Sequence, residues 1–371
     1  MNESKATRYQ RARRRAQAAG LASGGVMLAV LAFTPAGRHL AAWSASLTEW
    51  APAVARGPVT LGVLTLAMVV AWEVASWPAV WVLHRQADRR YAPATGLAEA
   101  FRAQLQAALV AAPAAWLAGV VMLAAGWLAG SWWWLLAGAV AGGLLVGAVH
   151  ATPGLLARSS GARPLDRPAL VERLGALARQ VRVDIDSIDA LPEASTVTAS
   201  ALVAGAGRAR RVFIAHELLS DWTDEEIAVV VAHELAHHAH YDLWRTLILD
   251  VAVLCAGLWA SSVVLPVVGA WPDGGGAVPL EALPGIALVT AGVWLLAVPL
   301  RHAASRRQER RADAFALDLT DSAEALQSVI KRLAARHFAE ERPSRWARWF
   351  YHRHPPVAER LRDAARFQRR G

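Results

Sequence analysis

The sequence predicts a mainly α-helical, polytopic membrane protein with about six spans and an α+β segment between the fourth and fifth spans. Of its 371 residues 55% are hydrophobic, and the mean hydropathy is +0.28. Soluble domains rarely have such a composition. A helix of about 20 apolar residues crosses the hydrocarbon layer of a bilayer. Six apolar stretches come near this length: 18–36, 59–83, 105–129, 132–150, 247–270 and 285–300.

The basic residues follow the predicted spans. The net charge is +9, and six Lys or Arg precede the first span. Arginines also gather in 85–102 and after 300, whereas 271–284 has none. Under the positive-inside rule, both termini and 151–246 are expected in the cytoplasm. The arginines border the membrane and do not form a patch on a soluble domain, so we expect a lipid bilayer and no nucleic acid as partner.

The same reasoning predicts the organisation of the chain. We expect a basic cytoplasmic tail, a four-span region, a cytoplasmic catalytic segment, a two-span region and a cytoplasmic C-terminal helical segment, at 1–17, 18–150, 151–246, 247–300 and 301–371. The first span is expected to stay as a helix and not to be cleaved as a signal peptide. Cys255 is the only cysteine, which excludes a disulfide or thiolate metal site within one chain. The arginine- and alanine-rich composition is typical of a GC-rich bacterium.

The most informative motif is His233-Glu234-Leu-Ala-His237. Four residues advance about one helical turn, so the two histidines face one side and can share a metal ion. Glu234 lies beside that face and can act as the base for a metal-activated water molecule. The pattern predicts a hydrolytic zinc site, with one zinc ion per chain.

The surrounding sequence places this motif inside a buried helix. Thr223-Asp-Glu-Glu226 has the spacing of a capping box, and an apolar stripe follows it into the histidines. His216-Glu217 upstream lacks a second histidine and cannot chelate a metal. His238 and His240 are expected to be polar residues at the helix exit, although ligand and proton-shuttle roles stay open.

A catalytic zinc ion needs three protein ligands, so a third one must come from elsewhere. Glu309 and Asp313 are four residues apart, just after the last predicted span. Glu309 is the candidate ligand, and Asp313 is expected to accept a hydrogen bond from a ligating histidine. The alternative is a solvated helical face with ordinary surface carboxylates.

These residues carry a resemblance. The order His233-Glu234-x-x-His237, two spans, and Ser305-Arg306-x-x-Glu309-x-x-Ala-Asp313 is similar to type I CAAX prenyl endopeptidases and the related bacterial heat-shock membrane proteases. The resemblance covers about residues 85–365. It implies a zincin-like catalytic domain with His233, His237 and Glu309 as zinc ligands, Glu234 as the base and Asp313 supporting a ligand.

The resemblance also extends to His354-Pro-Pro-x-x-Glu-Arg360. It implies that His354 and Arg360 lie near the active site, where they would stabilise the oxyanion or bind the substrate. Arg360 can instead form a structural ion pair, and both readings stay open.

Two soluble elements precede the zinc motif. The spacing of Leu170, Leu174, Leu177 and Val181 predicts an amphipathic helix. Residues 196–204 and 211–215 are predicted to form a hairpin, whose first strand can bind an extended peptide substrate or be purely structural. Ser200 is the expected substrate contact, at a position where the prenyl proteases carry asparagine.

The function expected from this evidence is that of an integral membrane zinc endopeptidase. It would cut membrane-associated proteins or peptides at the cytoplasmic face, in membrane protein quality control. The alternatives are a sensor protease that cuts a cytoplasmic repressor, and a non-catalytic membrane scaffold that retains the zinc fold. Glu73, inside the second predicted span, either lines a polar chamber or pairs with another helix.

Overall fold

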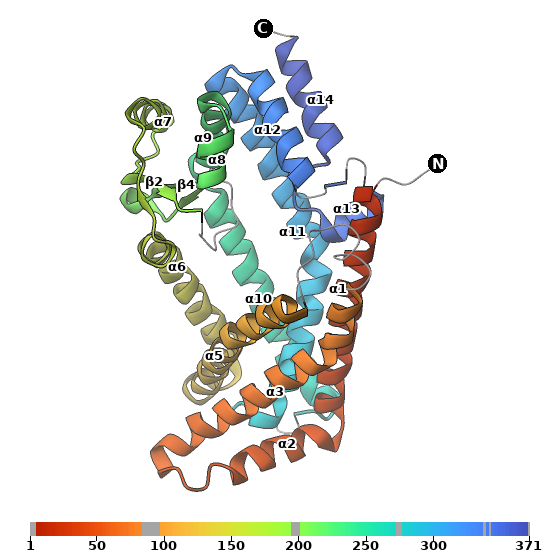
Figure 1. The fold of residues 1–371 in the computed structure, drawn as a ribbon. Coiled ribbons are helices and arrows are strands. Elements are labelled where there is room, and N and C mark those ends of the chain that lie inside the picture. The colour runs from red at the N-terminus through yellow and green to blue at the C-terminus, as the bar shows by residue number, and fades with distance from the viewer. Residues whose placement is uncertain are drawn as a thin grey trace. The chain divides into compact units, whose positions relative to one another are not determined.

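The computed structural model describes residues 5–83, 97–193, 201–271, 277–336, 339–340 and 343–369. Its helices and strands are labelled in Figure 1. The chain forms two compact units, each made of two chain segments. Unit 1 comprises Met1–Ala141 and Asp250–Ala297, and unit 2 comprises Gly142–Leu249 and Val298–Gly371. Three long helices, α6 (Trp133–Ser160), α10 (Asp242–Val267) and α11 (Leu283–Thr320), contribute to both units.

Unit 1 consists of long apolar helices. Besides parts of the three shared helices it contains α1 (Lys5–Phe33), α2 (Pro35–Ser46), α3 (Ala53–Leu83), α5 (Leu97–Ala129) and the short 3-10 helices η2 (Gly130–Trp132) and η4 (Leu280–Ala282). Helix α3 packs against α1 and α5. The core of the unit includes Leu61, Trp133, Leu265 and Trp271, all at most 2% exposed.

The outer surface of these helices is apolar. Val74, Trp127 and Leu128 are 69%, 81% and 66% exposed, as expected for side chains that face lipid. Within the described part of the chain, five helical stretches are long and apolar enough to cross a membrane: Ala6–Phe33, Ala53–Val82, Phe101–Ser160, Asp242–Val267 and Leu280–Thr320. The prediction of a polytopic helical membrane protein is therefore confirmed.

The six predicted spans map onto six helices, which lie within these five described stretches. The third stretch is 60 residues long and contains both α5 and α6. These helices are separated only by η2, which begins at Gly130 with a φ of 53°. Because this left-handed conformation is readily adopted by glycine, the chain can break the helix there without a polar loop.

Glu73 has a structural partner within unit 1. The side-chain amide of Gln104 on α5 donates a hydrogen bond to the Glu73 carboxylate on α3. The pair joins two neighbouring helices, which agrees with the second of the two roles expected for Glu73.

Unit 2 is built around a four-stranded sheet with strand order β1-β2-β4-β3. Its strands are β1 (Arg163–Pro164), β2 (Ser187–Leu191), β3 (Ala201–Ala204) and β4 (Arg211–Ala215). Strands β2 and β4 are parallel, whereas β3 and β4 form the predicted antiparallel hairpin, with Val203 opposite Val212. Strand β3 is an edge strand. Residues 196–200 of the predicted first strand, including Ser200, lie outside the described residues.

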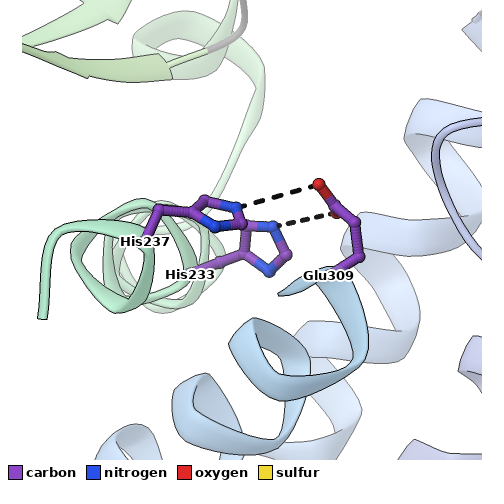
Figure 2. A group of neighbouring side chains, drawn as sticks. All are labelled: His233, His237 and Glu309. Atoms are coloured by element: carbon purple, nitrogen blue, oxygen red, sulfur yellow. Dashed lines mark ion pairs between the residues drawn. The ribbon is translucent and has the colours of Figure 1, made fainter. Parts of the chain in front are cut away.

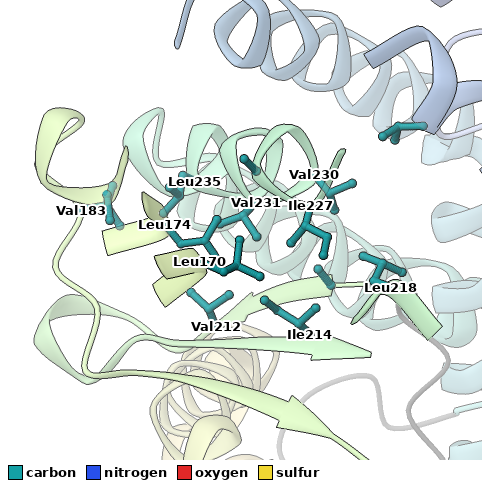
Figure 3. Close-up of a cluster of buried hydrophobic side chains, with 14 residues drawn as sticks. Leu170, Leu174, Val183, Val212, Ile214, Leu218, Ile227, Val230, Val231 and Leu235 are labelled. Atoms are coloured by element: carbon teal, nitrogen blue, oxygen red, sulfur yellow. The ribbon is translucent and has the colours of Figure 1, made fainter. Parts of the chain in front are cut away.

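The helices of unit 2 are α7 (Pro168–Gln180), α8 (His216–Asp221), α9 (Asp224–Ala239), α12 (Ala323–Arg336), α13 (Arg345–Tyr351) and α14 (Val357–Gln368), with the 3-10 turn η3 (Gly207–Ala209). Helix α7 confirms the predicted amphipathic helix. Its buried residues Leu170 and Leu174 pack with Val231 of α9 and Val212 of β4 (Figure 3). This cluster fixes α9 against one face of the sheet.

The start of α9 is held by the predicted capping box. The Thr223 hydroxyl accepts a hydrogen bond from the Glu226 backbone N–H, and the Glu226 carboxylate accepts one from the Thr223 backbone N–H. Ser328 and Arg332 of α12 also donate to this carboxylate, at 2.5 and 3.0 Å. Burial would raise the pKa of Glu226, but these donors and the charge of Arg332 lower it below its ordinary value.

We expect Glu226→Gln to destabilise the protein by about 1–3 kcal/mol at neutral pH, because charge-assisted hydrogen bonds are lost. Since the pKa of Glu226 is lowered on folding, its stabilisation is complete above the unfolded pKa of about 4.5 and disappears as the pH falls through the folded pKa. Melting in detergent between pH 3.5 and 7.5 measures this. The melting temperatures of wild type and variant should converge at acid pH. Glu225→Gln, an exposed neighbour, is the matched control, and an equal effect of both would contradict this role.

Candidate metal centre

Helix α9 presents two histidines on one face. His233 and His237 are separated by one turn, and their rings lie 5.0 Å apart in a nearly perpendicular arrangement. Both are half-buried, while Leu235 and Ala236 behind them are fully buried. The packing of α9 on the sheet therefore fixes where the two imidazoles point.

Helix α11 contributes the third side chain, as Figure 2 shows. Glu309 is 8% exposed. Its Oε2 lies 3.4 Å from His233 Nε2, and its Oε1 lies 3.8 Å from His237 Nε2. Ligand atoms of the three residues all lie within 4.8 Å of one another. The structure thus brings together the three residues that the sequence analysis proposed as ligands.

The opposite nitrogen of each imidazole faces a carboxylate. Asp313 Oδ1 lies 3.0 Å from His233 Nδ1, and Asp242 Oδ2 lies 3.0 Å from His237 Nδ1. Such carboxylates keep the proton on Nδ1 and leave Nε2 free to bind a metal. Glu309 Oε2 is buried, and no donor among the described residues forms a well-directed hydrogen bond to it. Two convergent Nε2 atoms and a carboxylate fit a zinc ion with one open coordination position.

The carboxylates also control the charge of His233. Burial would lower its pKa, but Asp313 and Glu309 together raise the pKa to about 10. The cluster therefore favours a positive charge at this position. Either a proton on His233 or a bound cation supplies that charge. His233 can bind a metal only when its Nε2 carries no proton.

Glu234 faces the same cluster. Its carboxylate interacts electrostatically with His233, His237, Glu309 and His354. Burial raises the pKa of Glu234 above its ordinary value, while the three histidines oppose this effect. A carboxylate with a raised pKa is a stronger base, which suits a residue that takes up a proton during hydrolysis.

His354 reaches the cluster from the loop between α13 and α14. Its Nδ1 lies 2.8 Å from Glu309 Oε2, and its side chain is 65% exposed. Arg306 of α11 holds the approach to this loop, because its Nη1 donates hydrogen bonds of 2.8 Å to the carbonyls of Arg348 and His352. Among the described imidazoles that meet at the cluster, that of His354 is the most exposed to solvent, since the side chains of His233 and His237 are only 14% and 24% exposed.

Arg360 lies behind the cluster and not in its open part. Its Nε and Nη2 donate to the two oxygens of Asp313, both at 2.7 Å. The Arg360 side chain is 15% exposed. This fork-shaped pair favours the ion-pair reading of Arg360 that the sequence analysis left open, because the guanidinium is occupied in orienting Asp313.

His238 has a more specific environment than a polar residue at a helix exit. Its Nδ1 accepts a hydrogen bond from Arg210 Nε at 3.1 Å, and its Nε2 donates to the carbonyl of Val203 at 2.9 Å. It thereby ties α9 to the edge strand β3. His240 caps the end of α9, and its Nδ1 bonds the Ala236 carbonyl at 2.8 Å. Neither residue joins the group of three.

Two residues that support the cluster were not predicted from the sequence. Asp242, the buried partner of His237, begins α10 directly after Tyr241, whose φ is 57°. Arg311 of α11 donates to the other oxygen of Asp242. The signal for Asp242 was an acidic residue five positions after the second histidine, at the start of a membrane-spanning helix.

We expect Asp313→Asn to weaken metal binding about 10- to 100-fold, since loss of an oriented partner disturbs the ligating histidine. Titration of the purified protein with a competing chelator measures the affinity. Asp318→Asn, on the same helix outside the cluster, is the control. An unchanged metal affinity in Asp313→Asn would show that the contact with His233 does not support a ligand.

The chain shares sequence features with known metalloproteases. The model of Peptidase family M48 matches residues 168–367, more than half of the chain, and this range includes every residue of the cluster. A Bacillus subtilis protein named "Uncharacterized metalloprotease YhfN" is 24% identical over 206 residues, which cover 54% of this chain and 48% of that protein. A Bacteroides fragilis "Protease HtpX homolog" is 27% identical over 218 residues, covering 53% of this chain and 63% of the relative. The chain thus spans about half to two thirds of the length of these relatives.

The fold has a counterpart among solved structures. The crystal structure of S. mikatae Ste24p matches with a TM-score of 0.64 and covers 87% of this chain and 79% of that one, at 15% sequence identity. The resemblance to CAAX prenyl endopeptidases and heat-shock membrane proteases is therefore confirmed at the level of family and fold. Taken together, the long apolar helices, the clustered His-His-Glu side chains and the match over residues 168–367 show that this chain is a multi-pass membrane protein of Peptidase family M48.

Proposed function

We propose that the protein is an integral membrane zinc endopeptidase that hydrolyses peptide bonds of membrane-associated proteins or peptides. The observation that carries the proposal is the approach of Glu309 to His233 and His237, with Glu234 beside them on α9. Two imidazoles and one carboxylate form the ligand set of a hydrolytic zinc site with one open position. We assign one zinc ion to each chain.

In the proposed mechanism, His233, His237 and Glu309 hold the ion, and Asp313 and Asp242 keep the two imidazoles oriented. When bound, zinc would supply a positive charge that activates water and polarises the scissile carbonyl. Glu234 takes a proton from the attacking water on its carboxylate and returns it to the leaving amine. The exposed imidazole of His354 donates a hydrogen bond to the oxyanion. Arg360 acts through Asp313, as a positioning residue.

We propose that the substrate binds along the described part of β3. This is an edge strand, and none of the strands that the structure describes pairs with the outer side of Ala201–Ala204, where an extended peptide can be added. The hydrogen bond from His238 to Val203 fixes this strand to the helix that carries His233 and His237. Ser200 directly precedes it and remains the proposed substrate contact. Its placement lies outside the described residues.

We place the site at the cytoplasmic face of a bacterial cell membrane, with both termini in the cytoplasm, on the distribution of arginines. Cysteines introduced into a Cys255→Ser background test this. Val54, 94% exposed, lies in the first turn of α3, next to the connection from the first span, and the exposed Asp363 lies on α14. In intact cells, V54C should react with a membrane-impermeant thiol reagent and D363C should react only after lysis. Labelling of D363C without lysis would contradict the topology.

Proteomics of cleavage products tests the function in cells. A strain that carries only Glu234→Gln should accumulate membrane proteins that the wild-type strain degrades, and should lack the corresponding cleavage fragments. The new termini are expected in segments on the cytoplasmic side, which fits a role in membrane protein quality control. Identical fragment profiles in both strains would rule out the protein as the protease responsible.

A further inference from the structure

A cavity with arginine-rich walls lies in unit 2, apart from the His-His-Glu cluster. Its volume is ≈ 330 Å³, within the range of small-ligand pockets. Ala303, Arg306, Arg307 and Arg310 line it from α11, and their spacing places them on one face of that helix. The wall from α13 is formed by Arg345, Arg348 and Trp349.

Two of the five arginines bind other groups of the protein. Arg306 is 6% exposed and donates to the carbonyls of Arg348 and His352. Arg348 forms a two-pronged ion pair with Glu359, at 2.7 and 3.2 Å. The remaining three, Arg307, Arg310 and Arg345, are exposed, and none is paired with a carboxylate among the residues that the structure describes. Three guanidinium groups around one cavity, without a carboxylate partner in the described part of the chain, favour an anionic occupant.

The position of the cavity along α11 relates it to the membrane. The apolar part of this helix ends at Leu300, and Arg306 to Arg310 follow six to ten residues later. At 1.5 Å per residue, this is about 9–15 Å along the helix axis. Long arginine side chains can reach back over part of that distance to the headgroup layer.

Exposed aromatic rings lie next to the cavity on α13. Trp346, Trp349, Phe350 and Tyr351 are 74%, 54%, 39% and 42% exposed. Trp346 stacks on Phe350 with ring centres 6.1 Å apart and lies 6.4 Å from the ring of Trp349, so these three rings form one patch. Tryptophan and tyrosine are enriched where a membrane meets water, because their rings are apolar and their N–H and O–H groups are polar.

We propose that this cavity binds the headgroup phosphate of an anionic phospholipid, with the aromatic patch of α13 in the adjoining interface. Arg307, Arg310 and Arg345 contact the phosphate, and Trp346 and Trp349 lie among the headgroups. The occupant also meets Arg306, the residue that holds the chain leading to His354. An acidic peptide would satisfy the arginines but gives no reason for exposed tryptophans beside the end of a membrane span.

Native mass spectrometry of the full-length protein tests the proposal, with phosphatidylglycerol and phosphatidylcholine as added lipids. Basic residues near a membrane surface each contribute about fivefold to the binding of anionic lipid, so Arg307→Gln, Arg310→Gln and Arg345→Gln together should weaken phosphatidylglycerol binding about 100-fold. Phosphatidylcholine binding should not change. The control removes the same charge from the exposed residues Arg173, Arg179 and Arg362. This control variant should bind phosphatidylglycerol with an affinity within about twofold of that of the wild type.

Arg307→Gln alone should weaken phosphatidylglycerol binding about fivefold. This single variant provides the test if the triple variant does not fold. Unchanged phosphatidylglycerol affinity in the single and triple variants would overturn the proposal. Displacement of the bound lipid by glycerol 3-phosphate or an acidic peptide as readily as by added lipid would also overturn it.

A spin label in W346C should be more accessible to oxygen dissolved in lipid than to a polar relaxation agent, and one in D363C should behave oppositely. Exclusive accessibility of W346C to the polar agent would contradict the interfacial position.

Discussion

Replacing Glu234 by glutamine is expected to reduce peptide hydrolysis by about 100- to 10,000-fold while the metal content stays unchanged. Glutamine has nearly the same shape but cannot accept the proton of the attacking water. The side chain makes electrostatic contact with both histidines and with Glu309 but is not among the three proposed ligands. Turnover of a casein-like or membrane-anchored reporter, measured with metal content on the same sample, tests both parts.

Glu225→Gln is the matched control for this variant. It removes the same charge from an exposed position on the same helix and should leave the rate unchanged. A near wild-type rate in Glu234→Gln would show that the base is another residue. Loss of metal together with activity would instead show that Glu234 belongs to the ligand set.

The second large effect is expected from Glu309→Ala, which should leave the chain folded in membranes but deplete it of metal. Glu309 supplies the only carboxylate oxygens that approach the Nε2 atoms of both His233 and His237 within 4 Å among the described residues. Two imidazoles alone form an incomplete zinc site. Metal analysis after dialysis measures the loss, and Gln308→Ala is the control on the same helix. Full metal retention in Glu309→Ala would remove Glu309 from the ligand set.

The sequence predicted those parts of the protein whose signals are local. Apolar length located the membrane helices, and the spacing of Thr223 and Glu226 located the start of α9. Helical spacing also placed His233 with His237, and Glu309 with Asp313, on common faces. The meeting of these two faces could not come from spacing, since it depends on packing between segments more than 70 residues apart. The resemblance to known proteases supplied that connection.

Other features depend on distant partners and could not be predicted. Strand β2 contains a buried aspartate, Asp189, and pairs in parallel with β4 about 24 residues later, so neither composition nor a hairpin turn marks it. Asp242 reaches His237 because Tyr241 adopts a left-handed conformation that few non-glycine residues take. The fork between Arg360 and Asp313 likewise joins α14 to α11 and has no local signal.

Zinc content of the purified wild-type protein tests the central claim most directly. The ligand geometry of His233, His237 and Glu309 predicts one zinc ion per chain by elemental mass spectrometry of protein purified without added metal. Chelation should remove zinc and hydrolysis together, and one equivalent of zinc should restore both. A fully active protein that contains no zinc, or a different metal in its place, would contradict the proposed centre.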